Sequence, residues 1–325
     1  MLRRGNKMLV GKKNQECNKM TIIDLLEHNA LQYPSESALV EINPKFEPSS
    51  RITWKDYALI QPEPGQPFRR EITWEDFNKK ANRFANLLLT RGCKKGDKIA
   101  ILLMNCIEWL PIYFGILKAG CIAVPMNYRY SSDEIKYCLE LADVEVFVFG
   151  PEFISRVNPI HNELKNIKIT LFVGNETPEY AENCMTLIRY CSSSLPPIAL
   201  DENDHAAIYF SSGTTGFPKA ILHRHKALYC SCLTEQKHHG QQKDDVFLCI
   251  PPLYHTGAKM HWFGSLLSGS KTVILRGIKP EWILRTITEE KCTIVWLLVP
   301  WAQDILDAID SGRINLDHYL LDHWR

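Results

Sequence analysis

The residues most able to do chemistry lie in one short segment, which reads Ser-Ser-Gly-Thr-Thr-Gly-Phe-Pro-Lys from Ser211 to Lys219. Its glycines would let the backbone approach a polyanion, its hydroxyl and amide groups could donate hydrogen bonds, and its lysine carries a positive charge. The segment therefore predicts a phosphate-binding loop, although a plain surface turn has a similar composition. It is not a Walker A loop, in which the lysine follows a glycine and precedes Ser or Thr, because Pro218 and Ala220 occupy those places.

Short apolar runs flank this loop at residues 207–210 and 220–222. Each run has the length of a strand rather than that of a helix. We therefore expect the loop to join two strands, and we expect Asp204 and His205 to form a turn before the first of them.

Histidines and cysteines, which are the usual zinc ligands, are frequent between residues 223 and 261. They are His223, His225, Cys230, Cys232, His238, His239, Cys249, His255 and His261. The spacing argues against zinc, because a single residue separates Cys230 from Cys232 where zinc knuckles have two. His238 and His239 are adjacent, and adjacent side chains on a helix point in different directions. We expect no metal ligands here.

The elements that must position the loop alternate between strands and helices. Apolar runs predict strands at 98–104, 121–126, 144–149, 167–173, 246–250, 272–275 and 293–299. Helical spacing predicts helices at 77–91, 107–117, 133–142 (with a capping box of Ser131 and Glu134), 259–267, from Glu281 onward, and 301–309. Strands that are apolar on both faces and lie between helices indicate an α/β fold with largely parallel sheets.

Two local features bear on domain organisation. The sequence Arg-Ile-Thr-Trp-Lys-Asp-Tyr at 51–57 recurs at 71–77 as Glu-Ile-Thr-Trp-Glu-Asp-Phe. Two copies are too few for a solenoid, so we expect a small hairpin-like insertion around residues 62–65. A Ser- and Pro-rich stretch at 191–198 is the best candidate linker. We therefore expect a disordered leader at 1–20 and two α/β subdomains at 21–198 and 199–325.

Composition narrows the class of protein. The chain has 325 residues, and its 38 Lys and Arg nearly balance its 37 Asp and Glu, so no field favours nucleic acid or a membrane surface. Eleven cysteines are scattered, many within apolar runs, which is typical of a reducing cytosol. The basic leader has no apolar core of a secretory signal, and no apolar stretch reaches the roughly 18 residues of a membrane span. We expect a soluble cytoplasmic protein.

The ordered string from Ser211 to Lys219 strongly resembles the signature of the adenylate-forming, or AMP-binding, superfamily, which includes acyl-CoA synthetases, luciferases and amino-acid adenylation domains. It departs from the usual pattern at Ser211, where Thr is usual, and at Ala220, where Gly is usual, and neither change removes a key donor. Further segments look like family motifs in the expected order, namely 96–105, 117–127 and Pro-Pro-Leu-Tyr-His-Thr-Gly at 251–257. His225 matches the histidine that commonly follows the loop. The resemblance covers roughly residues 22 to 325.

The resemblance implies the large N-terminal α/β domain of an acyl-CoA ligase, which uses ATP, Mg²⁺ and coenzyme A to convert a carboxylic acid into an acyl-adenylate and then a thioester. Phosphate contacts would come from Ser211, Ser212, Gly213, Thr214, Thr215, Gly216 and Lys219, with Thr214 and Lys219 stabilising the leaving pyrophosphate. His255, with Tyr254, Thr256 and Gly257, would lie beside the acyl and adenylate pockets. Without the resemblance, a capped turn is the simpler interpretation of His255. A fatty acid is the expected substrate.

Several family features have no counterpart between His225 and Arg325: the glycine-rich adenine segment, the Tyr-Gly-x-Thr-Glu motif, the ribose-binding Asp, the hinge, and the C-terminal domain with its catalytic Lys. We therefore expect a truncated ligase that has little turnover alone. The alternatives are another adenylating enzyme, of the amino-acid adenylation or luciferase type, and a catalytically inactive nucleotide-binding remnant.

Overall fold

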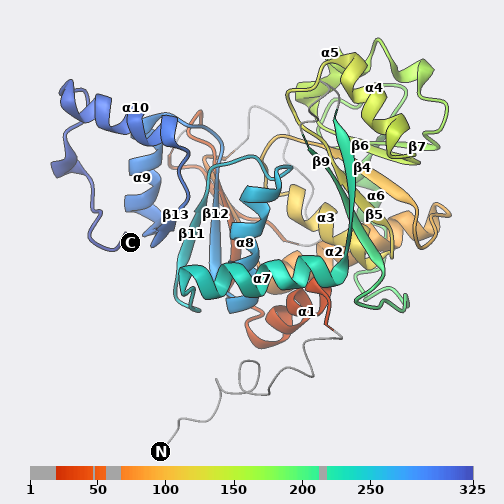
Figure 1. The fold of residues 1–325 in the computed structure, drawn as a ribbon, viewed down its shortest axis with the longest axis horizontal. Coiled ribbons are helices and arrows are strands. Elements are labelled where there is room, and N and C mark those ends of the chain that lie inside the picture. Colours follow the sequence, from red (N-terminus) through yellow and green to blue (C-terminus); the bar gives the residue numbers. More distant parts are fainter. Residues whose placement is uncertain (1–19, 47, 56–66, 212–217, 325) are drawn as a thin grey trace, which may run out of the picture.

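Two β-sheets form the frame of the molecule in the computed structural model, which describes residues 20–324 apart from 47, 56–66 and 212–217 (Figure 1). The seven-stranded sheet has the order β10-β9-β5-β4-β6-β7-β8, and the six-stranded sheet has the order β13-β11-β12-β1-β3-β2. The first contains Lys219–Arg224, His205–Ser211, Ile122–Pro125, Lys98–Leu102, Val146–Phe149, Ile169–Phe172 and Glu182–Asn183. The second contains Ile294–Val295, Val246–Cys249, Lys271–Leu275, Ser37–Ile42, Arg69–Thr73 and Arg51–Thr53. Only β9/β10 and β1/β3 pair antiparallel among the described strands, so the predicted largely parallel α/β architecture is confirmed.

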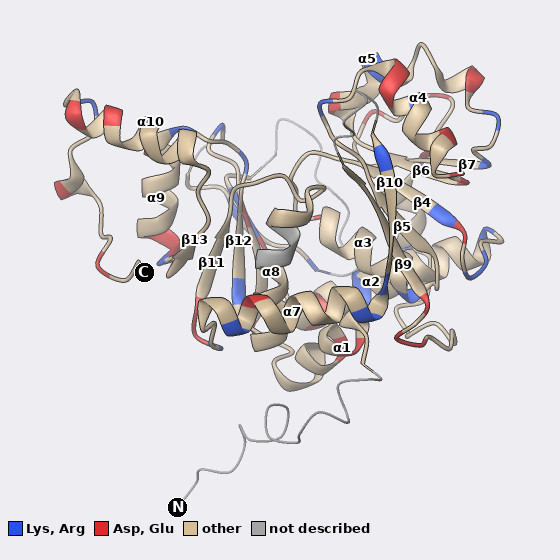
Figure 2. Ribbon diagram, in the orientation of Figure 1, with Lys and Arg blue, Asp and Glu red and all other residues tan. Residues whose placement is uncertain are grey.

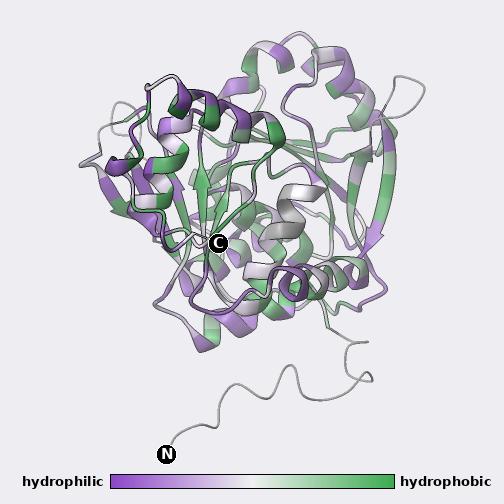
Figure 3. Ribbon diagram, turned by 60° about the vertical axis from the view of Figure 1, so that its left-hand side comes forward, coloured by the Kyte–Doolittle hydropathy of each residue, from purple (hydrophilic) through white to green (hydrophobic). Residues whose placement is uncertain are grey.

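Helices form three layers, one between the sheets and one outside each sheet. The α-helices are α1 (Ile22–Gln32), α2 (Trp74–Thr90), α3 (Trp109–Lys118), α4 (Ser132–Leu141), α5 (Ile154–Val157), α6 (Cys184–Ile188), α7 (His225–His239), α8 (Thr256–Ser268), α9 (Pro280–Glu290) and α10 (Val299–Asp310). The largest apolar cluster joins α1, α2, α3, α7 and α8 between the sheets. Two further clusters lie under α4 and α5 and under α9 and α10. The inner strands consist mainly of hydrophobic residues, whereas the outer helices carry both hydrophobic and hydrophilic residues (Figure 3).

Local sequence accounts for the central helices. Thr73 caps α2 by accepting a hydrogen bond from the Asp76 amide at 3.1 Å, and the predicted apolar face of this helix is buried. Every residue of α3 is buried, which is expected for a helix that is apolar nearly all round. The two helices approach so closely that a Cβ added to Gly115 would lie 2.8 Å from the Ala81 carbonyl oxygen. The capping box of Ser131 and Glu134 at α4 is also present as predicted.

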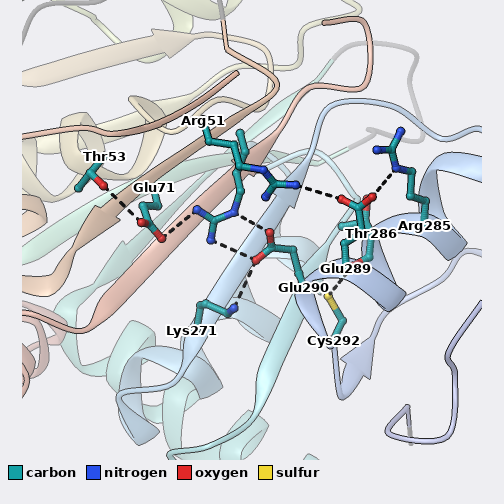
Figure 4. A network of polar contacts seen from close by, with 10 residues as sticks. Arg51, Thr53, Glu71, Lys271, Arg285, Thr286, Glu289, Glu290 and Cys292 are labelled. Atoms are coloured by element: carbon teal, nitrogen blue, oxygen red, sulfur yellow. Dashed lines mark hydrogen bonds and ion pairs between the residues drawn. The ribbon is translucent and has the colours of Figure 1, made fainter. Parts of the chain in front are cut away.

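The two copies of the repeat do not pair with each other as the arms of a hairpin. β2, in the first copy, pairs with β3 in parallel, with Thr53 opposite Glu71, whereas a hairpin requires antiparallel strands. Residues 62–65, around which the hairpin-like insertion is expected, lie outside the described residues. Ion pairs hold this sheet edge against α9: Arg51 contacts Glu289 at 3.5 Å (Figure 4), and Arg69 contacts Glu290 at 2.6 Å.

Two other expectations need correction. The strand predicted at 293–299 is limited to Ile294–Val295, because Val299 and Pro300 form the first turn of α10 and proline favours that position. The division expected at residue 198 does not separate the sheets, since each sheet contains strands from both sides of it. α1 and β1 were not predicted at all. Apart from Met20, the expected leader lies outside the described residues.

Charge and hydropathy agree with a folded core and a polar exterior. Charged residues of both signs are scattered over the outer elements in Figure 2. Within the part of the chain that the structure describes, no helix is both long enough and apolar enough to cross a membrane.

Candidate active site

The predicted phosphate loop connects two paired strands. β9 and β10 run antiparallel, and Lys219 lies opposite Ser211 in their register. This confirms that the loop joins strands rather than opening a helix. The strand pairing brings the two ends of the loop together, with Lys219 exposed and Ser211 half-buried. The remaining predicted loop residues, which are Ser212, Gly213, Thr214, Thr215 and Gly216, lie outside the described residues.

The strand that leads into the loop is anchored to the central helices. Tyr209 is buried two residues before Ser211, and its hydroxyl lies 2.8 Å from that of Tyr113 on α3. Burial raises the pKa of both phenols above the ordinary value, so both hydroxyls stay neutral and can donate hydrogen bonds. His223 on β10 packs edge-on against the Tyr209 ring at 5.2 Å between ring centroids.

His225, which the resemblance matched to the histidine after the loop, is fully buried at the start of α7. Burial lowers its pKa to about 4, against the opposing effect of the Asp204 carboxylate. Neither ring nitrogen has a hydrogen-bond partner among the described residues. Its backbone amide donates to the Asp204 carbonyl at 3.0 Å. His225 is therefore neutral near pH 7 and cannot supply a positive charge to a phosphate.

The second predicted group lies in the turn between β11 and α8. His255 is exposed and caps α8, because its Nδ1 accepts a hydrogen bond from the Gly257 amide at 3.1 Å. The capped turn expected from local sequence is thus confirmed. Since Nδ1 accepts, the neutral ring carries its proton on Nε2, which takes no part in the cap. Half-buried Tyr254 packs edge-on against Tyr128 at 5.4 Å between ring centroids.

A pocket of about 680 Å³ opens where strands of both sheets end. Its wall includes Asn105 after β4, Pro252 after β11 and Arg276 after β12. The carboxyl ends of parallel strands are where α/β sheets bind ligands. Lys219, Tyr254 and His255 are not among the residues that line this pocket, so it neighbours the His255 turn without containing it.

A group of charged residues that the sequence analysis missed adjoins this pocket, and its members Arg276 and Glu152 line the pocket wall. Buried Arg70 on β3 forms ion pairs with Glu41 at 2.8 Å and with Glu108. Arg276 extends the group, lying 3.9 Å from Glu41 and 3.0 Å from Glu152 after β6 of the other sheet. The sequence feature that could have revealed this buried charge group is Glu41, a carboxylate inside the apolar strand β1.

Asn105 is a second missed residue. It follows β4, and its amide makes hydrogen bonds to the turn that precedes His255, at the carbonyl of Pro251 and the amide of Leu253, both 2.8 Å. The sequence feature that could have revealed Asn105 is its position directly after the strand predicted at 98–104. Among the described residues, no three His, Cys, Asp or Glu side chains gather as metal ligands would.

Curated relatives are CoA ligases. The chain is 27% identical to a medium/long-chain-fatty-acid–CoA/3-oxocholest-4-en-26-oate–CoA ligase of Mycobacterium marinum over 263 residues, which cover 74% of this chain and 48% of the relative. It is 25% identical to 4-hydroxybutyrate–CoA ligase 2 of Metallosphaera sedula, and this match covers 68% of this chain and 42% of that relative. The chain thus spans about half the length of the curated relatives it matches.

Solved structures share the fold. An anthranilate CoA ligase, AuaEII, in complex with anthranoyl-AMP superposes with a TM-score of 0.78 at 24% identity, covering 94% of this chain and 54% of that one. The inhibitor-bound N-terminal domain of FACL13 from Mycobacterium tuberculosis superposes with a TM-score of 0.77 at 20% identity, covering 94% of this chain and 68% of that one. The architecture is that of the large domain of adenylate-forming enzymes.

The family comparison covers most of the chain. Residues 26–321 match the model of the AMP-binding enzyme family, a span that includes the β9–β10 loop, the His255 turn and both sheets. This chain belongs to the AMP-binding enzyme family.

Proposed function

We propose that this chain forms the ATP-binding part of an acid–thiol ligase. A carboxylate would attack the α-phosphorus of ATP to give an acyl-adenylate and pyrophosphate; the thiolate of coenzyme A would then attack the acyl carbonyl and release AMP. A fatty acid is the proposed substrate, supported by the name of the Mycobacterium marinum relative. Because the chain spans about half of that relative, the reaction is assigned to the protein expressed from its full reading frame.

The observation that carries this proposal is the pairing of Ser211 with Lys219 across β9 and β10. It closes a loop rich in hydroxyl groups and glycines at the carboxyl end of β9, which is parallel to β5. Displacement at phosphorus depends mainly on positioning and charge neutralisation. In our proposal, Lys219 and the hydroxyls of Ser211, Ser212, Thr214 and Thr215 hold the departing pyrophosphate, and the amides of Gly213 and Gly216 add donors.

The acid is proposed to lie near the other half of the site. Tyr254, His255, Thr256 and Gly257 would border the acyl and adenylate groups, with His255 Nε2 as a donor. Mg²⁺ would arrive with ATP as part of the substrate and share the neutralisation of phosphate charge. All three partners are small molecules, and the near balance of charge gives no reason to expect nucleic acid.

A cytoplasmic location is also proposed. The ten cysteines within the described residues are free thiols, and eight of them are buried. Scattered buried thiols are typical of a reducing compartment.

Carboxylate-dependent ATP–pyrophosphate exchange tests the function. In the protein expressed from the full reading frame, Lys219→Ala and Thr214→Val should each lower exchange at least tenfold, about 1.4 kcal/mol of barrier. The matched control is Lys243→Ala, which removes a lysine that pairs with Glu36. Exchange that is unchanged in both loop variants, or that falls equally in the control, would remove the assignment.

A further inference from the structure

The two halves of the proposed site lie on different sheets. Ser211 and Lys219 belong to β9 and β10 of the seven-stranded sheet, whereas His255 follows β11 of the six-stranded sheet. Their mutual placement therefore depends on contacts that cross from one sheet to the other.

Asn105 makes such a contact between the sheets with both the nitrogen and the oxygen of its side-chain amide. It follows β4 of the seven-stranded sheet, three residues after that strand ends at Leu102. Its Nδ2 donates to the Pro251 carbonyl at 2.8 Å, and its Oδ1 accepts from the Leu253 amide at 2.8 Å. The His255 amide in turn donates to the Pro252 carbonyl at 3.0 Å. One side chain thus holds the turn from which the His255 ring projects.

The segment that carries Asn105 is itself held in place. Two residues further on, the Ile107 amide donates to the Glu41 carboxylate at 2.7 Å, and Glu108 pairs with Arg70. Glu41 and Arg70 are buried on β1 and β3 of the six-stranded sheet. Asn105 is therefore positioned by a segment that is attached to the opposite sheet at several points, which makes it a rigid reference for the turn.

We propose that Asn105 is a positioning residue that sets the placement of His255 relative to the phosphate loop. The inference rests on the proposed function, and it predicts that Asn105 affects use of the acid more than binding of ATP, because Ser211 and Lys219 belong to the same sheet as β4, which Asn105 follows. Misplacement of a catalytic group by about 1 Å can lower a rate by about a hundredfold, so loss of the clamp should be visible in kinetics.

Two variants separate shape from hydrogen bonding. Asn105→Ala removes all three hydrogen bonds of this side chain, those with Ile250, Pro251 and Leu253. Asn105→Asp keeps the shape and the acceptor for the Leu253 amide, but it places a carboxylate oxygen against the carbonyls of Pro251 and Ile250, which lie 2.8 and 3.4 Å from Nδ2. The matched control is Asn86→Ala, since Asn86 on α2 also donates to two carbonyls, those of Ser192 and Ser194, at 2.8 and 2.9 Å.

The first measurement is hydrogen exchange of the Leu253 amide in the 325-residue chain. We expect exchange at least tenfold faster in Asn105→Ala and unchanged in Asn86→Ala. The second is ATP–pyrophosphate exchange by the protein expressed from the full reading frame. Here both Asn105 variants should lower kcat at least tenfold and raise KM for the acid, while KM for ATP stays within twofold.

The outcomes are distinguishable. An unchanged Leu253 amide in Asn105→Ala, or equal changes in KM for acid and ATP, would overturn the positioning role while leaving the proposed function intact. An unmodified protein that shows no exchange with any acid would overturn the proposed function and this inference with it.

Discussion

The hydroxyl groups of Tyr113 and Tyr209 lie 2.8 Å apart in the core, joining α3 to β9, the strand that enters the predicted phosphate loop. Removing one hydroxyl from such a buried pair costs about 1–3 kcal/mol, since the other group loses a partner after it has been desolvated. We expect Tyr113→Phe and Tyr209→Phe each to lower the free energy of unfolding by about 1–2 kcal/mol.

A double-mutant cycle measured by urea unfolding checks this prediction. The double variant should be less destabilised than the sum of the single variants, with a coupling free energy of about 0.5–1.5 kcal/mol. Strict additivity would mean that the two hydroxyls do not stabilise each other.

Arg70 pairs with Glu41 and Glu108, and all three side chains are buried. Burial alone would raise the pKa of Glu108, but the charge and hydrogen bonds of Arg70 lower it below the ordinary value. Removing one member of a buried ion pair leaves an uncompensated charge, so Arg70→Met should cost about 3–5 kcal/mol of unfolding free energy at pH 7.

Arg70→Lys is the matched comparison. It keeps the charge but not the planar guanidinium that reaches two carboxylates. The unfolding free energy of Arg70→Lys should therefore lie between those of Arg70→Met and the unchanged protein. Denaturant unfolding of both variants measures the difference, and an Arg70→Met chain within about 1 kcal/mol of the unchanged protein would contradict the prediction.

His225 should make stability depend on pH. Its pKa is lowered by burial to about 4 in the folded chain, whereas an unfolded histidine has a pKa near 6.5. Between these values the unfolded chain binds a proton that the folded chain does not. The contribution of His225 to the free energy of unfolding is therefore fully present above about pH 6.5, and it is lost toward pH 4 by up to about 1.4 kcal/mol per pH unit.

Urea unfolding from pH 7 to pH 4.5 measures this slope. His225→Phe, which cannot be protonated, should flatten it, while the control His318→Asn, at an exposed histidine, should keep it. The nearby charges of Asp204 and Asp24 favour protonation and Lys95 opposes it, so they alter the slope without changing its sign. An equal slope in His225→Phe would assign the pH dependence to other groups.

The sequence by itself determined the local features. Thr73 caps α2, Ser131 and Glu134 cap α4, and two short apolar runs around the loop became β9 and β10. These features were predictable because caps, periodicity and turn residues act over a few positions along the chain. The phosphate loop is predicted for the same reason, since its hydroxyl groups, glycines and lysine are contiguous in the sequence. α1 carries a comparable local signal, a capping box of Thr21 and Asp24.

Only the tertiary structure decided which distant residues meet. The repeat suggested a hairpin, but β2 lies parallel to β3, and the division at residue 198 cuts through both sheets. Asn105 contacts Pro251 across 146 positions of sequence, and Arg70 lies between carboxylates from β1 and the start of α3. Strand order and the crossing between sheets are set by burial of whole apolar faces, and no short pattern encodes them.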